Sequence, residues 1–211
     1  MQARSLRWMK TAVFILALIP FVRLVAAAFA DQLGANPLEF ITRSTGDWTL
    51  YLLCLTLAVT PLRRMTGWTW LLRLRRMLGL FTFFYASLHF TTFLWFDHFF
   101  DLSEMMRDVL KRPFIAVGFV AYLLLVPLAA TSTDAMIRRL GGKKWQRLHR
   151  VIYAIAPLAV LHFWWMKAGK NDFAQPLLFT LLVALLLLVR LYWRWARRAR
   201  LGGKDGAFPA A

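Results

Sequence analysis

Long apolar runs separated by short connections are the feature that most constrains this chain. Each run approaches the roughly 20 residues that a helix needs to cross the hydrocarbon core of a membrane. The runs lie at about 10–30, 48–64, 76–96, 114–131, 150–167 and 175–195. Of the 211 residues, 60% are hydrophobic and only 18% are charged, which leaves no room for a soluble domain. The sequence therefore predicts an all-α polytopic membrane bundle with six transmembrane helices, forming one domain over residues 1–200.

The basic residues are divided unevenly between the two ends of these segments. Of the 27 lysines and arginines, nineteen lie on one side of the predicted membrane: before the first segment, after the second, after the fourth and after the sixth. Six lie on the other side, in the connections after the first, third and fifth segments. Because positively charged connections remain in the cytoplasm, we expect both termini to be cytoplasmic in a bacterial inner membrane. Ala28-Phe29-Ala30 resembles a signal-peptide cleavage site, but Arg23 interrupts the run, so we expect the first helix to be retained. Residues 201–211 are expected to form a disordered tail.

A net charge of +17 first suggests a nucleic-acid partner. The positive residues, however, form short clusters between the apolar runs, so we interpret them as topology signals and lipid contacts, with no nucleic acid involved. The single cysteine, Cys54, excludes an intramolecular disulfide and a CxxCH haem attachment. Any haem would therefore be bound non-covalently.

Histidines inside the apolar runs are the strongest candidates for function, because ionisable groups in a membrane span are costly. His89 lies in the third segment, thirteen residues beyond its start at Arg76, and His162 lies in the fifth, thirteen residues beyond His149. Thirteen helical residues rise by roughly 20 Å. The two histidines should thus lie at one depth towards the periplasm, where their imidazoles could hold a haem iron from both faces. His98 lies at the periplasmic edge and is interpreted as an interface residue.

His149 is harder to interpret. Thirteen residues turn an ideal helix by about 220°, so the two histidines of the fifth segment face different sides unless Pro157 changes the helix phase. The positions that would oppose His149 on the third segment hold Arg75 and Arg76, with Met77 close by. Either an inner haem has an unusual ligand or His149 is not an axial ligand. The arginines could instead pair with haem propionates or with a flavin phosphate.

The remaining motifs concern local structure. Apolar residues at helical spacing within 98–113 predict a short periplasmic surface helix. Thr131-Ser132-Thr133 could cap a short helix over 134–140, which we favour, or could hydrogen-bond a cofactor. Gly141-Gly142 fits a turn before the fifth helix. The chain has no Gly-rich phosphate loop and no HExxH metal motif.

Several of these motifs, taken in order, resemble the MsrQ (YedZ-type) family over nearly the whole chain. They are Thr60-Pro61-Leu62, residues 72–80 (LRLRRMLGL) leading to His89, residues 131–133 (TST), residues 138–141 (RRLG), and residues 145–150 (WQRLHR) followed by Tyr153 and His162.

The resemblance implies a ferric-reductase-type haem domain that serves as the membrane subunit of a periplasmic methionine sulfoxide reductase system. Its partner would be a soluble molybdopterin subunit that reduces methionine sulfoxide. Its electrons would come from the quinone pool or a cytosolic flavin reductase, and FMN binding is ascribed to the family. The family histidines map onto His89, His149 and His162. The wider superfamily has two histidines on each of the third and fifth helices, and this chain lacks one on the third.

We therefore expect a transmembrane electron conduit that does not itself reduce methionine sulfoxide. An electron would enter near Arg75, Arg76 and His149, pass to a haem b held by His89 and His162, and leave to the docked reductase through the periplasmic face. The chain would hold one or two haems. Three alternatives remain: a ferric reductase of the same fold with another acceptor, a small transporter with a histidine proton relay, and a membrane scaffold without a cofactor.

Overall fold

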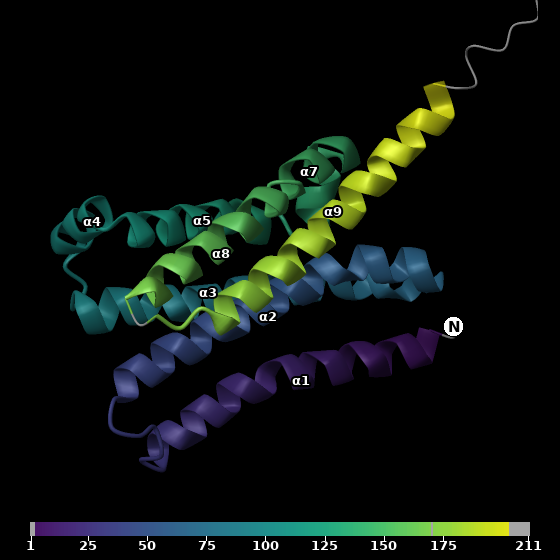
Figure 1. The fold of residues 1–211 in the computed structure, drawn as a ribbon. Helices are drawn as coiled ribbons and strands as arrows, with labels where there is room; N and C mark the ends of the chain where they lie inside the picture. The colour runs from purple at the N-terminus through teal and green to yellow at the C-terminus, as the bar shows by residue number, and fades with distance from the viewer. Residues whose placement is uncertain (1–2, 170, 203–211) are drawn as a thin grey trace, which may run out of the picture.

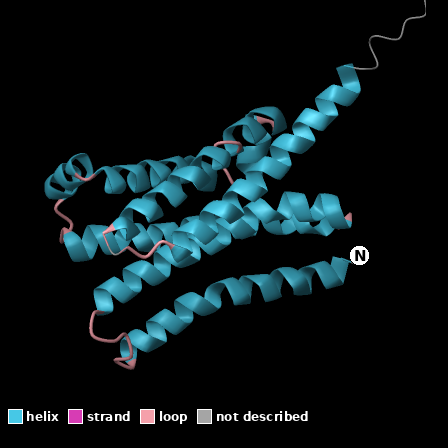
Figure 2. Cartoon of the chain, viewed as in Figure 1, coloured by secondary structure: helices cyan, strands magenta, loops and turns pink. Residues whose placement is uncertain are grey.

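Long helices occupy all six predicted segments in the computed structural model, which describes residues 3–169 and 171–202 (Figure 1). The described residues contain helices and loops but no strand (Figure 2). The prediction of an all-α bundle is confirmed. The long helices are α1 (Ala3–Phe29), α2 (Pro37–Thr66), α3 (Leu72–Thr92), α5 (Pro113–Ala130), α8 (Ile152–Ala168) and α9 (Ala174–Gly202).

Five stretches of the described chain are long and apolar enough to cross a membrane. They are Arg4–Phe29, Thr69–Asp97, Pro113–Ala130, Gly142–Ala168 and Ala174–Arg197. Of the six predicted spans, α2 is the one outside this set. Its uncharged stretch runs only over residues 48–62, between Asp47 and Arg63. The chain is thus a multi-pass membrane protein, and a crossing by α2 stays a prediction.

Short helices connect the long ones. The predicted surface helix within 98–113 is present as α4 (Leu102–Lys111), and a π-helical turn, η2 (Phe93–Asp97), precedes it. A 3-10 turn, η1 (Thr69–Leu71), leads into α3. The segment between α5 and α8 forms α6 (Asp134–Leu140) and α7 (Gly142–His149), which meet at Gly141 with a φ of 75°. The hydroxyl of Thr133 accepts a hydrogen bond from the Met136 N–H at 3.2 Å, so the predicted cap is present.

The fifth span departs from the sequence prediction in one respect. His149 is the last residue of α7, and α8 begins at Ile152 after a two-residue break. Pro157 lies inside α8 without ending it. The helix is therefore interrupted at residues 150–151 and not at the proline, where the sequence had allowed for a change of helix phase.

The helices share two hydrophobic cores. Buried residues of α2, α5, α8 and α9, with Ala86 of α3, form one, and buried residues of α1, α2 and α3 form the other. The most extensive pairings are α2 with α3 and α5 with α8. In Figure 1, the start of α1, the α7 region and the end of α9 lie at one end of the bundle, and α4 lies at the other.

Tyr85 of α3 holds α1 to the bundle. Its hydroxyl donates to the Ala17 carbonyl at 2.8 Å and accepts from the Phe21 N–H at 3.0 Å. In a regular helix these two backbone groups would bond to each other. The hydroxyl is inserted beside Pro20, which has no N–H to donate, so Tyr85 satisfies backbone groups that lipid could not.

At its C-terminal end, α9 extends through Gly202, so the first two residues of the predicted tail are helical. The rest of that tail lies outside the described residues.

Candidate functional site

His89 of α3 and His162 of α8 lie next to each other, as their matched depths predict. Their ring centroids are 6.2 Å apart, and the ring planes are inclined at 76°. Both rings line a cavity of about 1140 Å³ between α2, α3, α5 and α8. The two helices are not consecutive in the chain, so the pairing comes from the tertiary packing.

Each imidazole is held by one backbone carbonyl. His89 Nδ1 lies 2.9 Å from the Thr42 carbonyl oxygen, and His162 Nδ1 lies 2.7 Å from the Phe114 carbonyl oxygen. Since a carbonyl only accepts, each Nδ1 carries the proton and each Nε2 keeps its lone pair. Histidines that bind metals commonly donate their other ring N–H to a carbonyl in this way.

Glycines make both contacts sterically possible. Gly46 lies four residues after Thr42 on α2, and a Cβ there would be 3.2 Å from His89 Cε1. Gly118 lies four residues after Phe114 on α5, and a Cβ there would be 2.7 Å from His162 Nδ1. The same arrangement therefore occurs twice: an imidazole packs on a glycine and donates to the carbonyl one turn earlier.

The ring separation fits two ligands on opposite sides of one metal ion. A metal–imidazole bond is about 2 Å long, so two imidazoles sharing an ion have ring centres about 6 Å apart. Within the described chain, no group of three or more His, Cys, Asp and Glu side chains could hold a bare metal ion. A haem needs only the two axial ligands from the protein, because the porphyrin supplies the others. The donor set therefore suits haem better than a simple metal centre.

The cavity is lined by both apolar and charged residues. Its apolar lining includes Leu50, Ala86, Ala121 and Leu125. Charged residues of both signs also line it: Asp97, Glu104, Arg107, Asp108, Lys111 and Arg112 lie on or beside α4, and Arg43, Asp47, Lys167 and Asp172 lie on or beside α2 and α8. Two of these, Lys167 and Asp172, form an ion pair of 2.7 Å, and the hydrogen bond from Lys167 lowers the pKa of Asp172 below its usual range.

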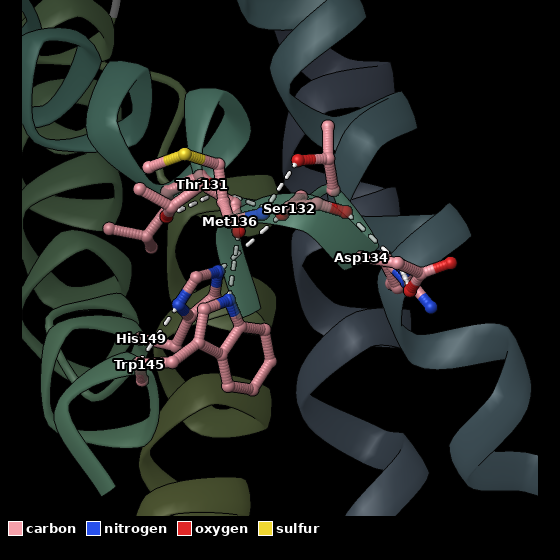
Figure 3. Close-up of polar contacts among 9 residues, drawn as sticks. Thr131, Ser132, Asp134, Met136, Trp145 and His149 are labelled. Atoms are coloured by element: carbon pink, nitrogen blue, oxygen red, sulfur yellow. Dashed lines mark hydrogen bonds and ion pairs between the residues drawn. The ribbon is translucent and has the colours of Figure 1, made fainter. Parts of the chain in front are cut away.

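His149 lies in a separate cluster at the other end of the bundle (Figure 3). Its Nδ1 donates to the Trp145 carbonyl at 3.1 Å, and its Nε2 is 3.4 Å from the Ser132 hydroxyl. The Trp145 ring stacks on the imidazole with centroids 3.9 Å apart, and Trp145 Nε1–H donates to the Thr131 carbonyl at 2.9 Å. Within the described chain, no second imidazole faces His149.

The two arginines expected beside His149 have different surroundings. Arg76 pairs with Asp134 at 2.5 Å and also donates to the Ser132 carbonyl at 3.3 Å. The guanidinium holds the pKa of the Asp134 carboxyl below its usual range. Arg75 is half-buried and close enough to act electrostatically on His149. Arg75 thus fits the predicted role of an anion partner better than Arg76, which α6 already neutralises.

Sequence reasoning missed several residues of these sites. Nothing in the sequence around Gly46 or Gly118 indicates that a histidine ring packs against it. Arg190 of α9 is another such residue. It is buried, donates to the Leu57 and Leu186 carbonyls, and lies over the Tyr153 ring. An arginine in the middle of an apolar run was the available signal for it.

Comparison with known proteins gives consistent matches. Residues 45–160 match the family described as ferric reductase like transmembrane component. The chain is 66% identical over 196 residues to the protein-methionine-sulfoxide reductase heme-binding subunit MsrQ of Herminiimonas arsenicoxydans, covering 93% of this chain and 90% of that protein. The subunits of the same name from Ralstonia nicotianae and Bordetella pertussis are 57% and 55% identical, covering 98% and 93% of this chain and 95% of each relative. No solved structure matches.

Proposed function

This chain belongs to the MsrQ family of haem-binding membrane subunits with a ferric-reductase-like transmembrane domain, and from that premise we propose that it carries electrons across a bacterial inner membrane to a periplasmic methionine sulfoxide reductase. The pairing of His89 with His162 is the observation that carries this proposal. Both rings have Nδ1 bound to a carbonyl and Nε2 available, at a ring separation of 6.2 Å. When bound, haem accepts and releases one electron at a time.

The residues of the proposed haem site have different roles. His89 and His162 hold the iron of a b-type haem, and the Thr42 and Phe114 carbonyls fix the orientation of the imidazoles. Apolar side chains, among them Leu50, Ala86, Ala121 and Leu125, line the cavity that the two rings share. The haem is bound without a covalent link, since the single cysteine is elsewhere, on α2.

Electrons enter at the end of the bundle that contains Arg75 and His149. We assign this end to the cytoplasm because the basic residues are concentrated there, and we assign α2 as the sixth span. The donor is the quinone pool or a cytosolic flavin reductase, and Arg75 is placed to attract an anionic donor. FMN binding and a second haem at His149 stay predictions from the family resemblance.

Electrons leave at the opposite end of the bundle. Residues 31–47, which include the start of α2, and residues 98–113, which include α4, offer a docking surface there. The partner is a soluble molybdopterin subunit, and methionine sulfoxide is reduced there and not in this chain. We treat residues 1–200 as a single haem-binding domain.

A visible spectrum of the detergent-purified protein tests the haem site. We expect a reduced-minus-oxidised difference with b-type Soret and alpha bands, and its loss in His89→Ala and His162→Ala. Thr91→Ala is the control, since Thr91 lies on the same helix, is exposed, and bonds only to the Ser87 carbonyl. A haem-free wild-type chain would contradict the proposal and favour the proton-relay transporter or the scaffold. Full haem content in both histidine variants would contradict the ligand pair.

The acceptor needs a test in cells. Deleting the gene should stop electron delivery to the periplasmic sulfoxide reductase, while complementation with Thr91→Ala should restore it. If delivery continues after deletion and the purified chain still contains haem, the ferric reductase with another acceptor becomes the better reading.

A further inference from the structure

His98 is a buried histidine for which the proposed electron path has no use. Its side chain is only 6% exposed, and neither ring nitrogen has a hydrogen-bond partner among the described residues. The ring lies edge-on to Phe93, with centroids 4.6 Å apart. Buried polar groups are nearly always hydrogen-bonded, so an unsatisfied imidazole indicates a missing partner. His98 lines the same cavity as His89 and His162.

The backbone that follows His98 is strained. Phe99 and Phe100 have φ values of 46° and 67°, in the left-handed region that bulky side chains rarely adopt. Two such residues in succession persist only where the surrounding structure requires them, and strain of this kind collects at functional sites. This observation is independent of the unsatisfied ring nitrogens and concerns the same few residues.

One face of His98 is occupied by an acid. Asp108 Oδ2 is 3.6 Å from His98 Nε2, and Arg112 Nε holds the other oxygen of Asp108 at 2.8 Å. Asp97 precedes His98 in the chain. The Nε2 side of the ring therefore faces a carboxylate that is already neutralised, whereas Nδ1 is left without any protein group.

The polarity of the cavity restricts how an amphipathic cofactor can lie in it. Apolar side chains line part of the cavity, and charged side chains line other parts, including the walls formed by α4 and the residues around His98. A b-type haem has one apolar edge and one edge with two propionate carboxylates. Burying those carboxylates among apolar side chains would be strongly unfavourable. The carboxylate edge therefore belongs against polar walls, and His98 offers a buried ring nitrogen there that has no partner among the described residues.

We propose that His98 is a binding residue for a haem propionate, with Nδ1–H donating to the propionate carboxylate and Nε2–H donating to Asp108. This inference rests on the proposed haem site. Making both bonds requires an N–H on each ring nitrogen, and Arg112 already pairs with Asp108. Bonds between charged partners are stronger than neutral ones, and the neutral imidazole could make only one of the two.

This arrangement couples reduction to protonation. Asp97 on the same turn and Asp108 and Arg112 from α4 and its end are the charged groups facing His98, and Glu104, Arg107 and Lys111 line the cavity beyond them. An added electron makes the cavity more negative and favours proton uptake by a group bonded to the propionate. If His98 makes this bond, the midpoint potential should fall as pH rises.

The test is a potentiometric titration of the purified haem-loaded protein from acid to neutral pH. The wild type should have a pH-dependent midpoint potential, and His98→Gln, which keeps a hydrogen-bond donor without a titrating charge, should lose most of that dependence. His98→Phe should in addition retain haem about tenfold less tightly, as expected for losing a bond to a charged group. Ser103→Ala, an exposed change on α4, should behave as wild type.

Replacing the haem by a derivative without free carboxylates tests whether His98 acts on a propionate. Reconstitution with the dimethyl ester of the same haem removes both carboxylates and leaves the iron and its ligands unchanged. With this ester, the wild type and His98→Gln should give the same pH-independent potential. If the substitution changes the potential equally with both cofactors, His98 acts through another molecule, such as a quinol, and the propionate assignment is overturned. A wild-type chain without haem would instead refute the proposed function.

Discussion

Gly118→Ala should weaken haem binding more than the same change at Gly46 or Gly79. The added Cβ would lie 2.7 Å from His162 Nδ1 and 2.8 Å from His162 Cε1, and real Cβ atoms are almost never found so close to another heavy atom. The glycine is in the middle of α5, so the backbone cannot retreat without disturbing the helix. The imidazole must move instead.

The size of the effect follows from the two contacts that change. Moving the ring breaks the 2.7 Å bond from His162 Nδ1 to the Phe114 carbonyl, and an unsatisfied buried group costs about 1–3 kcal/mol. Accommodating an extra methyl in a packed site costs about 1–3 kcal/mol. These terms overlap, so we expect a combined loss of about 2–4 kcal/mol. At about 1.4 kcal/mol per factor of ten, haem affinity should fall roughly 30-fold to 700-fold.

Two other glycines make the comparison quantitative. At Gly46 the added Cβ would lie 3.2 Å from His89 Cε1, which a shift of a few tenths of an ångström relieves, so Gly46→Ala should cost less than tenfold. At Gly79 the nearest atom would be Thr56 Cγ2 at 3.8 Å, an ordinary contact. Gly79→Ala should leave haem binding unchanged, because the added methyl contacts no histidine ring. It should not destabilise the helix either, because alanine is a better helix former than glycine by about 1 kcal/mol.

The assay is haem per chain in detergent-purified protein, followed by titration of haem into the stripped protein. We expect the order of loss to be Gly118→Ala, then Gly46→Ala, then Gly79→Ala with none. Wild-type affinity in Gly118→Ala would refute the role of the glycine, and equal losses in all three variants would attribute the effect to general destabilisation of the helices.

Three further outcomes are expected. Tyr85→Phe should lower stability by about 1–3 kcal/mol in denaturant unfolding, because two backbone groups of α1 lose their partner, while Tyr51→Phe, a control that loses no such contact, should not. The pKa of Asp172 is lowered, so its ion pair with Lys167 contributes stability above the usual carboxyl range and loses it as pH falls; Asp172→Asn should lower thermal stability at neutral pH and flatten its acid dependence. His149→Ala should leave the haem spectrum of the His89 site intact, and its complete loss would contradict the ligand assignment.

Local sequence patterns were sufficient for much of the architecture. The apolar runs predicted all six long helices, the spacing within 98–113 predicted α4, and Thr133 was correctly favoured as a helix cap. The equal spacing of His89 from Arg76 and of His162 from His149 predicted a common depth at which the two rings could meet, and the rings lie 6.2 Å apart. These features depend on the fixed rise of a helix and on residues close together in the chain, so the sequence carries them directly.

Other features depend on which helix faces which. His149 belongs to α7, which ends there, and its imidazole meets Ser132, whereas His162 lies on α8, which begins at Ile152. His98, expected at the membrane interface, is buried in the cavity because η2 and the turn after it carry the ring inwards. No pattern along the chain marks either outcome, since both depend on the packing of distant helices.

The histidines themselves illustrate the division. Their number and their expected common depth follow from the sequence through helix geometry. That the two rings meet was decided by the tertiary packing of α3 and α8. The carbonyls of Thr42 and Phe114, and the glycines that let the imidazoles reach them, were decided by the tertiary structure. Depth along a helix depends only on residue number. The rotation of a helix about its axis, which selects the contacts of each ring, is set by the packing of all its neighbours.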